Sequence, residues 1–226
     1  MANNLDLEEQ EQLDQLKHFW RQYGNWITWA LIVVLGAFAA WNFYQRWQLS
    51  QASQAAALYD ELERVAKAAD LPKLDRVMGD MKEKFPATTY AQQAAFLSAK
   101  AYFEAGKIEQ AKASLSWVAE KSSDPGYQSI ARLRLAAVLM ESKAYDDAFK
   151  QLNGTFPDEF AALVADRKGD IFSLQGKKTE SRAEYEKAYG TLGDRSEYRR
   201  LVEVKLNALG VNPRPESPVV TTESKK

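Results

Sequence analysis

Cysteine is absent from this 226-residue sequence, and His18 is its only histidine. Without thiols the chain has no disulfide, no thiolate nucleophile and no cysteine-ligated zinc. A single imidazole excludes metal sites built from several histidines, and it removes the proton carrier that acid–base enzymes use most often. These absences argue against most classes of enzyme.

A strong net charge is also missing, because 30 basic and 31 acidic side chains leave a formal charge of −1. Bulk basicity therefore gives no reason to expect a nucleic-acid partner. The sequence has no phosphate-binding, dinucleotide-binding, zinc-protease or nucleophile-elbow motif. Adjacent acidic residues such as Asp146 and Asp147 point about 100° apart on a helix, so they do not converge on one substrate atom. We predict no enzyme activity, no cofactor and no metal ion.

What the sequence does contain is the apolar stretch NWITWALIVVLGAFAAWNFYQRW, within which residues 25–45 carry no charge. As a helix, residues 26–44 would measure roughly 28 Å, close to the hydrocarbon thickness of a bilayer. Aromatic rings stand at both ends, where the headgroup region favours them. These rings are Tyr23, Trp26, Trp29, Trp41, Tyr44 and Trp47. We predict a transmembrane helix over residues 25–45 and contact with a lipid bilayer.

The alternative is a signal peptide that is removed, because Ala37–Phe38–Ala39 fits the small-x-small rule for cleavage. The preceding segment is long and acidic, however, and apolar character continues past that site, so an uncleaved anchor is favoured. Lys17 and Arg21 precede the span, whereas Arg46 alone follows it closely. By the positive-inside rule this bias predicts a cytoplasmic N-terminus.

Residues 1–24 are predicted to be a short cytoplasmic segment. Apolar side chains recur there at helical spacing, at Leu13, Leu16, Trp20 and Tyr23. Two interpretations stay open: a separate amphipathic helix on the membrane surface that ends before Gly24, or a helical extension of the span. His18 is interpreted as an interfacial side chain rather than a ligand.

Residues 46–210 are predicted to form an all-α domain. Helix is expected to continue out of the membrane, because no glycine or proline lies between Ala37 and Leu71. One apolar stripe follows the 3.6-residue period there: Leu58, Leu62, Val65, Ala66 and Ala69. Pro72 is expected to open the next helix, which ends before Pro86. Alternation typical of strands is absent.

Three segments repeat: AYFEAGKIEQA (101–111), VLMESKAYDDA (138–148) and IFSLQGKKTES (171–181). Each is predicted to end one helix, turn, and start another, with the turns at Gly106, Lys143 and Gly176. Small and large residues recur in the same order in each repeat: Ala99, Tyr102, Ala111, Leu115 and Val118; Ala136, Leu139, Ala148 and Leu152; and Gly169, Phe172, Ser181, Tyr185 and Ala188. The spacing is close to the 34 residues of the tetratricopeptide repeat. About three degenerate repeats with flanking helices, forming an α-solenoid, are therefore expected.

The chain is expected to end with a helix that starts at Ser196 and stops at Gly210. Residues 211–226 contain three prolines and no periodicity. They are predicted to be a disordered tail.

Partner binding is predicted on the inner face of the solenoid, which the first helix of each repeat lines. The candidate protein-binding residues are Gln93, Phe96, Lys100, Phe103, Leu133, Met140, Asp166 and Asp170. Phenylalanine and methionine suit adaptable contact with extended segments. The competing interpretation is that many of these side chains pack inside the stack.

With EEQEQLDQLKHFWRQYGN before the span and LVEVKLNALG at the end, the chain resembles the YfgM family of Gram-negative bacteria. The resemblance covers residues 8–210, and LKHFWRQYGN is its most specific part. It implies an inner-membrane protein with a cytoplasmic N-terminus and a periplasmic repeat domain. It also implies an ancillary subunit of the SecYEG translocon, partnered with the periplasmic chaperone PpiD, that assists handover or folding of secreted proteins.

Two other functions remain as alternatives. A repeat scaffold could assemble an envelope complex without binding clients, and Gly36 and Ala40 form a small-xxx-small pair suited to contact between spans. A signalling adaptor facing the cytoplasm would require the opposite topology.

Overall fold

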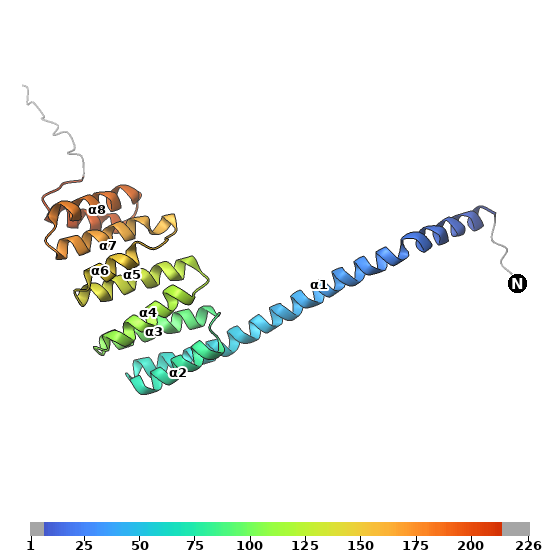
Figure 1. Ribbon diagram of the computed structural model, residues 1–226, viewed down its shortest axis with the longest axis horizontal. Coiled ribbons are helices and arrows are strands. Elements are labelled where there is room, and N and C mark those ends of the chain that lie inside the picture. The colour runs from blue at the N-terminus through green and yellow to red at the C-terminus, as the bar shows by residue number, and fades with distance from the viewer. Residues whose placement is uncertain (1–6, 214–226) are drawn as a thin grey trace, which may run out of the picture. The chain divides into compact units, whose positions relative to one another are not determined.

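A computed structural model describes residues 7–213 (Figure 1). Residues 1–6 and 214–226 lie outside the described part, and with them most of the tail predicted over 211–226. The chain divides into two compact units, residues 1–54 and residues 55–226. Within the described residues the regular structure is helical and includes no strand, which confirms the all-α prediction.

The helices follow one another along the chain with short connections. They are α1 (Leu7–Lys67), α2 (Leu71–Lys84), α3 (Thr89–Glu104), α4 (Ile108–Lys121), α5 (Pro125–Glu141), α6 (Tyr145–Leu152), the 3-10 turn η1 (Asp158–Phe160), α7 (Ala161–Leu174), α8 (Lys178–Thr191) and α9 (Glu197–Ala208). Side chains of Asp70, Thr88 and Asp124 cap α2, α3 and α5 by accepting backbone N–H groups. These polar caps satisfy donors that a helix start leaves without a partner.

In the first unit, α1 is unbroken from residue 7 onward and passes through Gly24. The helical extension of the span is therefore the interpretation that the structure supports, and no separate helix ends before Gly24. α1 contains a stretch long and apolar enough to cross a bilayer, none of which is buried within the protein. Trp26 is 78% exposed and Phe43 is 74% exposed.

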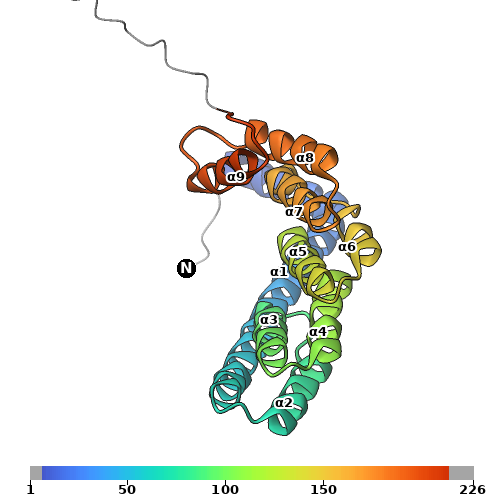
Figure 2. The ribbon, with the colours of Figure 1, turned by 90° about the vertical axis from the view of Figure 1, so that its left-hand side faces the viewer.

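In the second unit, the helices from α2 to α8 stack in two rows (Figure 2). One row holds α3, α5 and α7, and the other holds α2, α4, α6 and α8. The predicted turns at Gly106, Lys143 and Gly176 have φ values of 71°, 58° and 73°. After each turn a backbone N–H bonds the carbonyl five residues back, as from Lys107 to Tyr102 at 2.8 Å. The three predicted turns are thus confirmed, each in the left-handed form that closes a helix end.

A fourth turn of the same kind lies at Ala69, where φ is 54° and the N–H of Asp70 bonds the carbonyl of Val65 at 3.2 Å. The prediction that Ala69 belongs to the apolar stripe is wrong, because this residue forms the exposed turn instead. The last turns of α1 and helix α2 consequently form a further helix pair, one period before the first predicted repeat.

Leu62 and Leu74 occupy the crossing of this first pair, at places corresponding to Ala99 and Ala111 one repeat later. Both leucines are fully buried. Their size hides the repeat pattern in the sequence, because small residues are the usual sign of a close helix crossing. The helix that contains the apolar stretch therefore also supplies the first helix of the repeat stack.

Helices α7 and α8 approach each other closely at Gly169. A Cβ added there would lie 2.5 Å from two ring carbons of Tyr185. The corresponding residues of the other two repeats, Ala99 with Leu115 and Ala136 with Leu152, are buried as well. Each of the three predicted repeats therefore combines a small residue on its first helix with a large one on its second.

Candidate protein-binding groove

A groove of about 630 Å³ lies along α3, α5 and α7, with contributions from α4 and α6. Four of the predicted binding residues line it: Phe96, Lys100, Phe103 and Met140. Leu174 at the end of α7 lines it too, although it was not among the predicted residues. Leu174 follows Asp170 by four residues, so the helical spacing of α7 is the signal that could have selected it.

Phe96 on α3 forms part of one wall of the groove, and two side chains of α5 pack against its ring. The ring of Phe96 stacks on that of Tyr127, with centroids 6.0 Å apart and planes 19° apart. The guanidinium carbon of Arg134 lies 4.7 Å from the centroid of the Phe96 ring. Cation–π attraction of this kind holds the guanidinium group against the ring. The wall is consequently both apolar and positively charged.

The outer part of the groove exposes large apolar surface. Phe103 is 40% exposed and Leu174 is 58% exposed, whereas Met140 is buried at 8%. When a partner covers apolar surface of this kind, binding becomes more favourable by about 25 cal/mol for each Å² removed from water. The groove therefore offers contact area that the chain itself leaves open.

Two other predicted residues lie outside the groove lining. The side-chain amide of Gln93 donates to the hydroxyl of Tyr127 at 3.2 Å. Leu133 is partly buried against the core cluster that includes Leu135 and Leu139. Their interactions are made within the stack, so binding of a partner by Gln93 and Leu133 stays a prediction.

Asp166 and Asp170 on α7 are covered by α9. The ammonium group of Lys205 lies 2.7 Å from each of the two carboxylates. Tyr198 donates its hydroxyl to Asp166 at 2.6 Å, and Tyr185 donates to Asp170 at 2.8 Å. Asp166 is only 1% exposed. The two carboxylates are therefore already ion-paired and hydrogen-bonded to other groups of the chain. The bonds from Lys205 and Tyr198 connect α9 to α7.

A matching tyrosine–carboxylate bond joins α3 to α2, where the hydroxyl of Tyr102 donates to Asp75. Burial raises the pKa of Tyr102 above its ordinary value, and the hydrogen bond to Asp75 adds to the effect. Burial likewise raises the pKa of Tyr185 and of Tyr198, each helped by its bond to a carboxylate. No local sequence signal marks these pairs, because their partners come from different helices.

The groove provides contact surface and charge. Among residues 11–213, no group of three or more His, Asp or Glu side chains is placed to hold a metal ion. What the groove can do chemically is to bind a segment of polypeptide through apolar contacts and hydrogen bonds.

Comparison with known families agrees with this geometry. The family described as tetratricopeptide repeat-like domain matches residues 17–211, which is most of the chain. The paired helices, the left-handed turns and this match define the class: a helical-repeat protein of the tetratricopeptide type. No solved structure matches the chain.

Several curated relatives share one name, ancillary SecYEG translocon subunit. The relative from Neisseria gonorrhoeae is 31% identical, over 90% of this chain and 98% of its own length. The relative from Haemophilus influenzae is also 31% identical with the same coverage, and that from Escherichia coli is 28% identical over 79% of this chain and 85% of its own. The chain belongs to this family, YfgM, as the resemblance in the sequence implied.

Proposed function

We propose that this protein is an ancillary subunit of the SecYEG translocon, anchored in the inner membrane by a single span. In this proposal residues 1–24 are cytoplasmic, residues 25–45 cross the membrane, and residues 46–210 form a periplasmic repeat domain. The domain assists handover or folding of secreted proteins, together with a PpiD-like periplasmic chaperone. It acts by binding and not as an enzyme.

The observation that carries the proposal is the open apolar groove lined by Phe96, Phe103 and Met140. In the described part of the chain that bears this groove, one helix is apolar enough to span a membrane. Helix α1 contains both that stretch and residues of the repeat unit, so the two belong to one tethered chain. A tether of this kind raises the effective concentration of groove and target to roughly millimolar, so weak contacts suffice. The names of the relatives support the choice of translocon.

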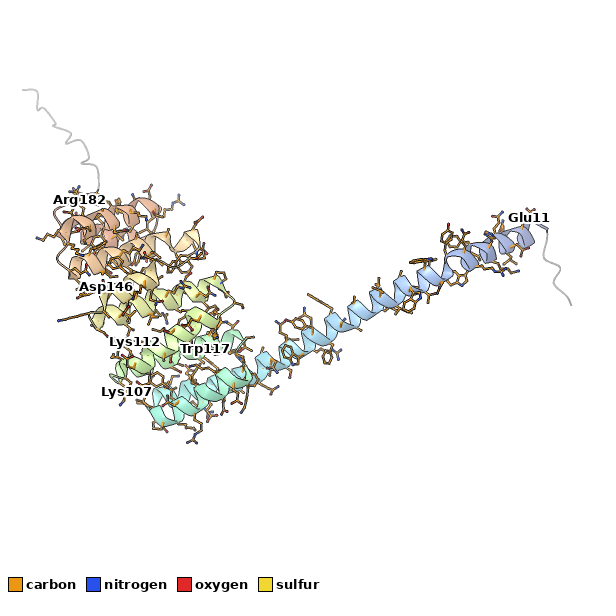
Figure 3. All side chains as sticks on the ribbon, viewed as in Figure 1. Glu11, Lys107, Lys112, Trp117, Asp146 and Arg182 are labelled. Carbon is orange, nitrogen blue, oxygen red and sulfur yellow. The ribbon has the colours of Figure 1, made fainter. Side chains whose placement is uncertain are left out.

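Site-specific photo-crosslinking tests the proposal. A photoreactive residue is placed at Lys100 or Phe103 in the groove, and at Arg182 on α8 as a control (Figure 3). We expect adducts with translocon subunits, the chaperone or chains in transit from the two groove positions only. Absence of such adducts, or equal adducts from Arg182, would contradict the proposal.

A single cysteine tests the topology, since the natural chain has none. Ser123→Cys places the thiol in the exposed connection between α4 and α5. A membrane-impermeant maleimide is expected to label it in intact spheroplasts. Labelling only after lysis would place the repeats in the cytoplasm and contradict the proposal.

The scaffold alternative makes a different prediction at Gly36. A Cβ added there meets no atom within 4 Å. Gly36→Leu is therefore expected to leave the single chain undisturbed, and a change of oligomeric state in detergent would report contact between spans. Dimers that Gly36→Leu dissociates, combined with no groove adducts, would favour the scaffold.

A further inference from the structure

The groove gathers much of the apolar surface that the repeat unit leaves uncovered. In the described part of the chain after α1, four large apolar side chains are exposed: Phe103, Leu174, Leu201 and Val204. Phe103 and Leu174 both line the groove, at the C-terminal ends of α3 and α7. A segment lying across α3, α5 and α7 would cover both of them.

The same groove is lined by basic side chains. They are Lys100, Arg134, Lys143 and Arg167, against the single acidic residue Glu141. The whole chain has a formal charge of −1. The positive charge of the groove is therefore a local feature and not a reflection of overall composition.

Two of these cations have no acidic partner within the described residues. Arg134 lies against the Phe96 ring, and neither it nor Lys143 forms an ion pair there. Lys100 pairs only loosely with Glu104, at 3.7 Å and with both side chains mostly exposed. Arg167 lies 3.4 Å from Asp170, but its Nε has no hydrogen-bond partner. Charge that the fold has not neutralised thus faces the apolar surface.

We propose that the groove selects polypeptide segments in which acidic residues stand beside large apolar ones, and that it rejects basic segments. The inference rests on the proposed function and names the chemistry of the segments that the groove accepts. Apolar side chains of the segment cover Phe103 and Leu174, while its carboxylates face Arg134 and Lys143. A groove with one sign of charge and apolar walls favours the complementary sign and repels its own.

The chain's own C-terminal segment does not fit this description. Residues 211–226 contain Arg214, Lys225 and Lys226 but only two acidic residues, Glu216 and Glu223. Their side-chain charge is therefore positive, which is the sign that the groove repels. A segment of another protein is the occupant that the charges favour.

Binding of matched peptides to the full-length protein in detergent tests this inference. Three labelled peptides share one pattern of Leu and Phe and differ only in the intervening residues, which are Glu, Lys or Ser. We expect the Glu peptide to bind about tenfold more tightly than the Lys peptide at low salt. The ratio is expected to fall towards one as salt rises from roughly 0.01 M to 1 M, where the screening length shrinks from about 30 Å to about 3 Å.

A charge reversal of the groove sharpens the test. In a triple variant with Lys100→Glu, Arg134→Glu and Lys143→Glu, we expect the Lys peptide to become the tighter ligand. An inverted preference cannot arise from loss of folding. The matched control reverses three exposed lysines on the other row of helices, with Lys121→Glu, Lys150→Glu and Lys187→Glu. It changes the net charge equally and is expected to keep the preference for the Glu peptide.

The outcomes separate this inference from the proposed function. Equal binding of the Glu and Lys peptides would overturn the charge selectivity while leaving groove binding intact. Inversion by the control variant as well would overturn it, because bulk charge would then explain the preference. If no peptide bound while groove adducts persisted in cells, the selectivity would be overturned and the proposed function would stand.

Discussion

Large apolar side chains are exposed along the predicted span of α1, whereas in the repeat unit most of them are buried. Val33 and Val34 are 65% and 64% exposed, whereas Leu74 and Leu152 are at most 1% exposed. The same hydrophobic effect acts on both sets, but only the repeat leucines find protein to cover them. In the proposed topology lipid covers the valines, so the two regions depend on different surroundings.

The two regions also differ in their charged residues. The predicted span has no charged residue, whereas α7 and α9 join through two acidic groups and one lysine. A buried charge is tolerated when it is paired, and an unpaired one is costly in either surrounding. Changes that affect one region are therefore expected to leave the other intact.

The largest expected effect comes from Lys205→Met, which removes the cation held 2.7 Å from both Asp166 and Asp170. An almost fully buried carboxylate then loses its counter-charge, which costs about 4 kcal/mol of unfolding free energy. Urea unfolding followed by circular dichroism measures the loss. Lys187→Met, at an exposed site on α8, is the control. An unchanged midpoint for Lys205→Met would show that the pairing contributes nothing.

The second largest effect is expected from Val34→Lys, which places a charge in the predicted span. A lysine at the centre of a transmembrane helix costs about 3 kcal/mol of insertion free energy. We expect less protein in the carbonate-resistant membrane fraction, with the thermal unfolding of the repeats unchanged. Val34→Leu is the matched control, because it keeps the apolar character. Undiminished membrane recovery of Val34→Lys would contradict the transmembrane assignment.

A smaller effect is expected from Gly169→Ala in the repeat unit. The new methyl group would lie 2.5 Å from ring carbons of Tyr185, and such overpacking costs about 2 kcal/mol of stability. Tyr185→Leu makes room and recreates the alanine–leucine pair found at Ala136 and Leu152.

A double-mutant cycle measures this coupling between α7 and α8. We expect Gly169→Ala to cost less when Tyr185→Leu is already present. Equal costs in the two backgrounds would show that the close approach at Gly169 does not limit the packing.

The smallest effect is that of a single tyrosine on alkaline stability. Burial raises the pKa of Tyr102, Tyr185 and Tyr198 from the ordinary value of 10.0, so the folded state keeps these protons while the unfolded state loses them. Their contribution is complete below about pH 10 and declines above it, by about 1 kcal/mol for each tyrosine at about pH 11.

Urea unfolding at about pH 8 and about pH 11 tests whether the free energy of unfolding falls at alkaline pH as expected. Tyr185→Phe is expected to reduce the alkaline loss by one tyrosine's share. Tyr59→Phe is the control, because the hydroxyl of Tyr59 makes no hydrogen bond to a carboxylate within the described structure. If Tyr185→Phe left the alkaline loss of stability unchanged, this would contradict the attribution of part of that loss to the raised pKa of Tyr185.

Local signals predicted much of the fold. Gly106 and Gly176 adopt the left-handed backbone that glycine favours, and Pro72 lies in the first turn of α2 as expected. The turn at Ala69 escaped prediction because alanine gives no such signal. Leu62 and Leu74, at the crossing of that first pair, also lack the small size by which repeats are recognised.

The candidate site was predictable only in part. Phe96, Lys100, Phe103 and Met140 line the groove because helical periodicity places them on the face that α3 and α5 share. The same periodicity cannot show that α9 folds back over Asp166. That contact depends on Lys205, which lies 39 residues further along the chain.

By itself the sequence determined the helices, most of their ends, the apolar stretch of α1 and the absence of thiol or multi-histidine chemistry. These properties depend on side-chain type and on neighbours within a few residues, which a single sequence displays. The tertiary structure alone decided that the end of α1 is part of the repeat stack, which acidic residues are covered, and where Leu174 completes the groove. Contacts between distant helices determine these features, and their energies depend on distance and burial that only the folded chain defines.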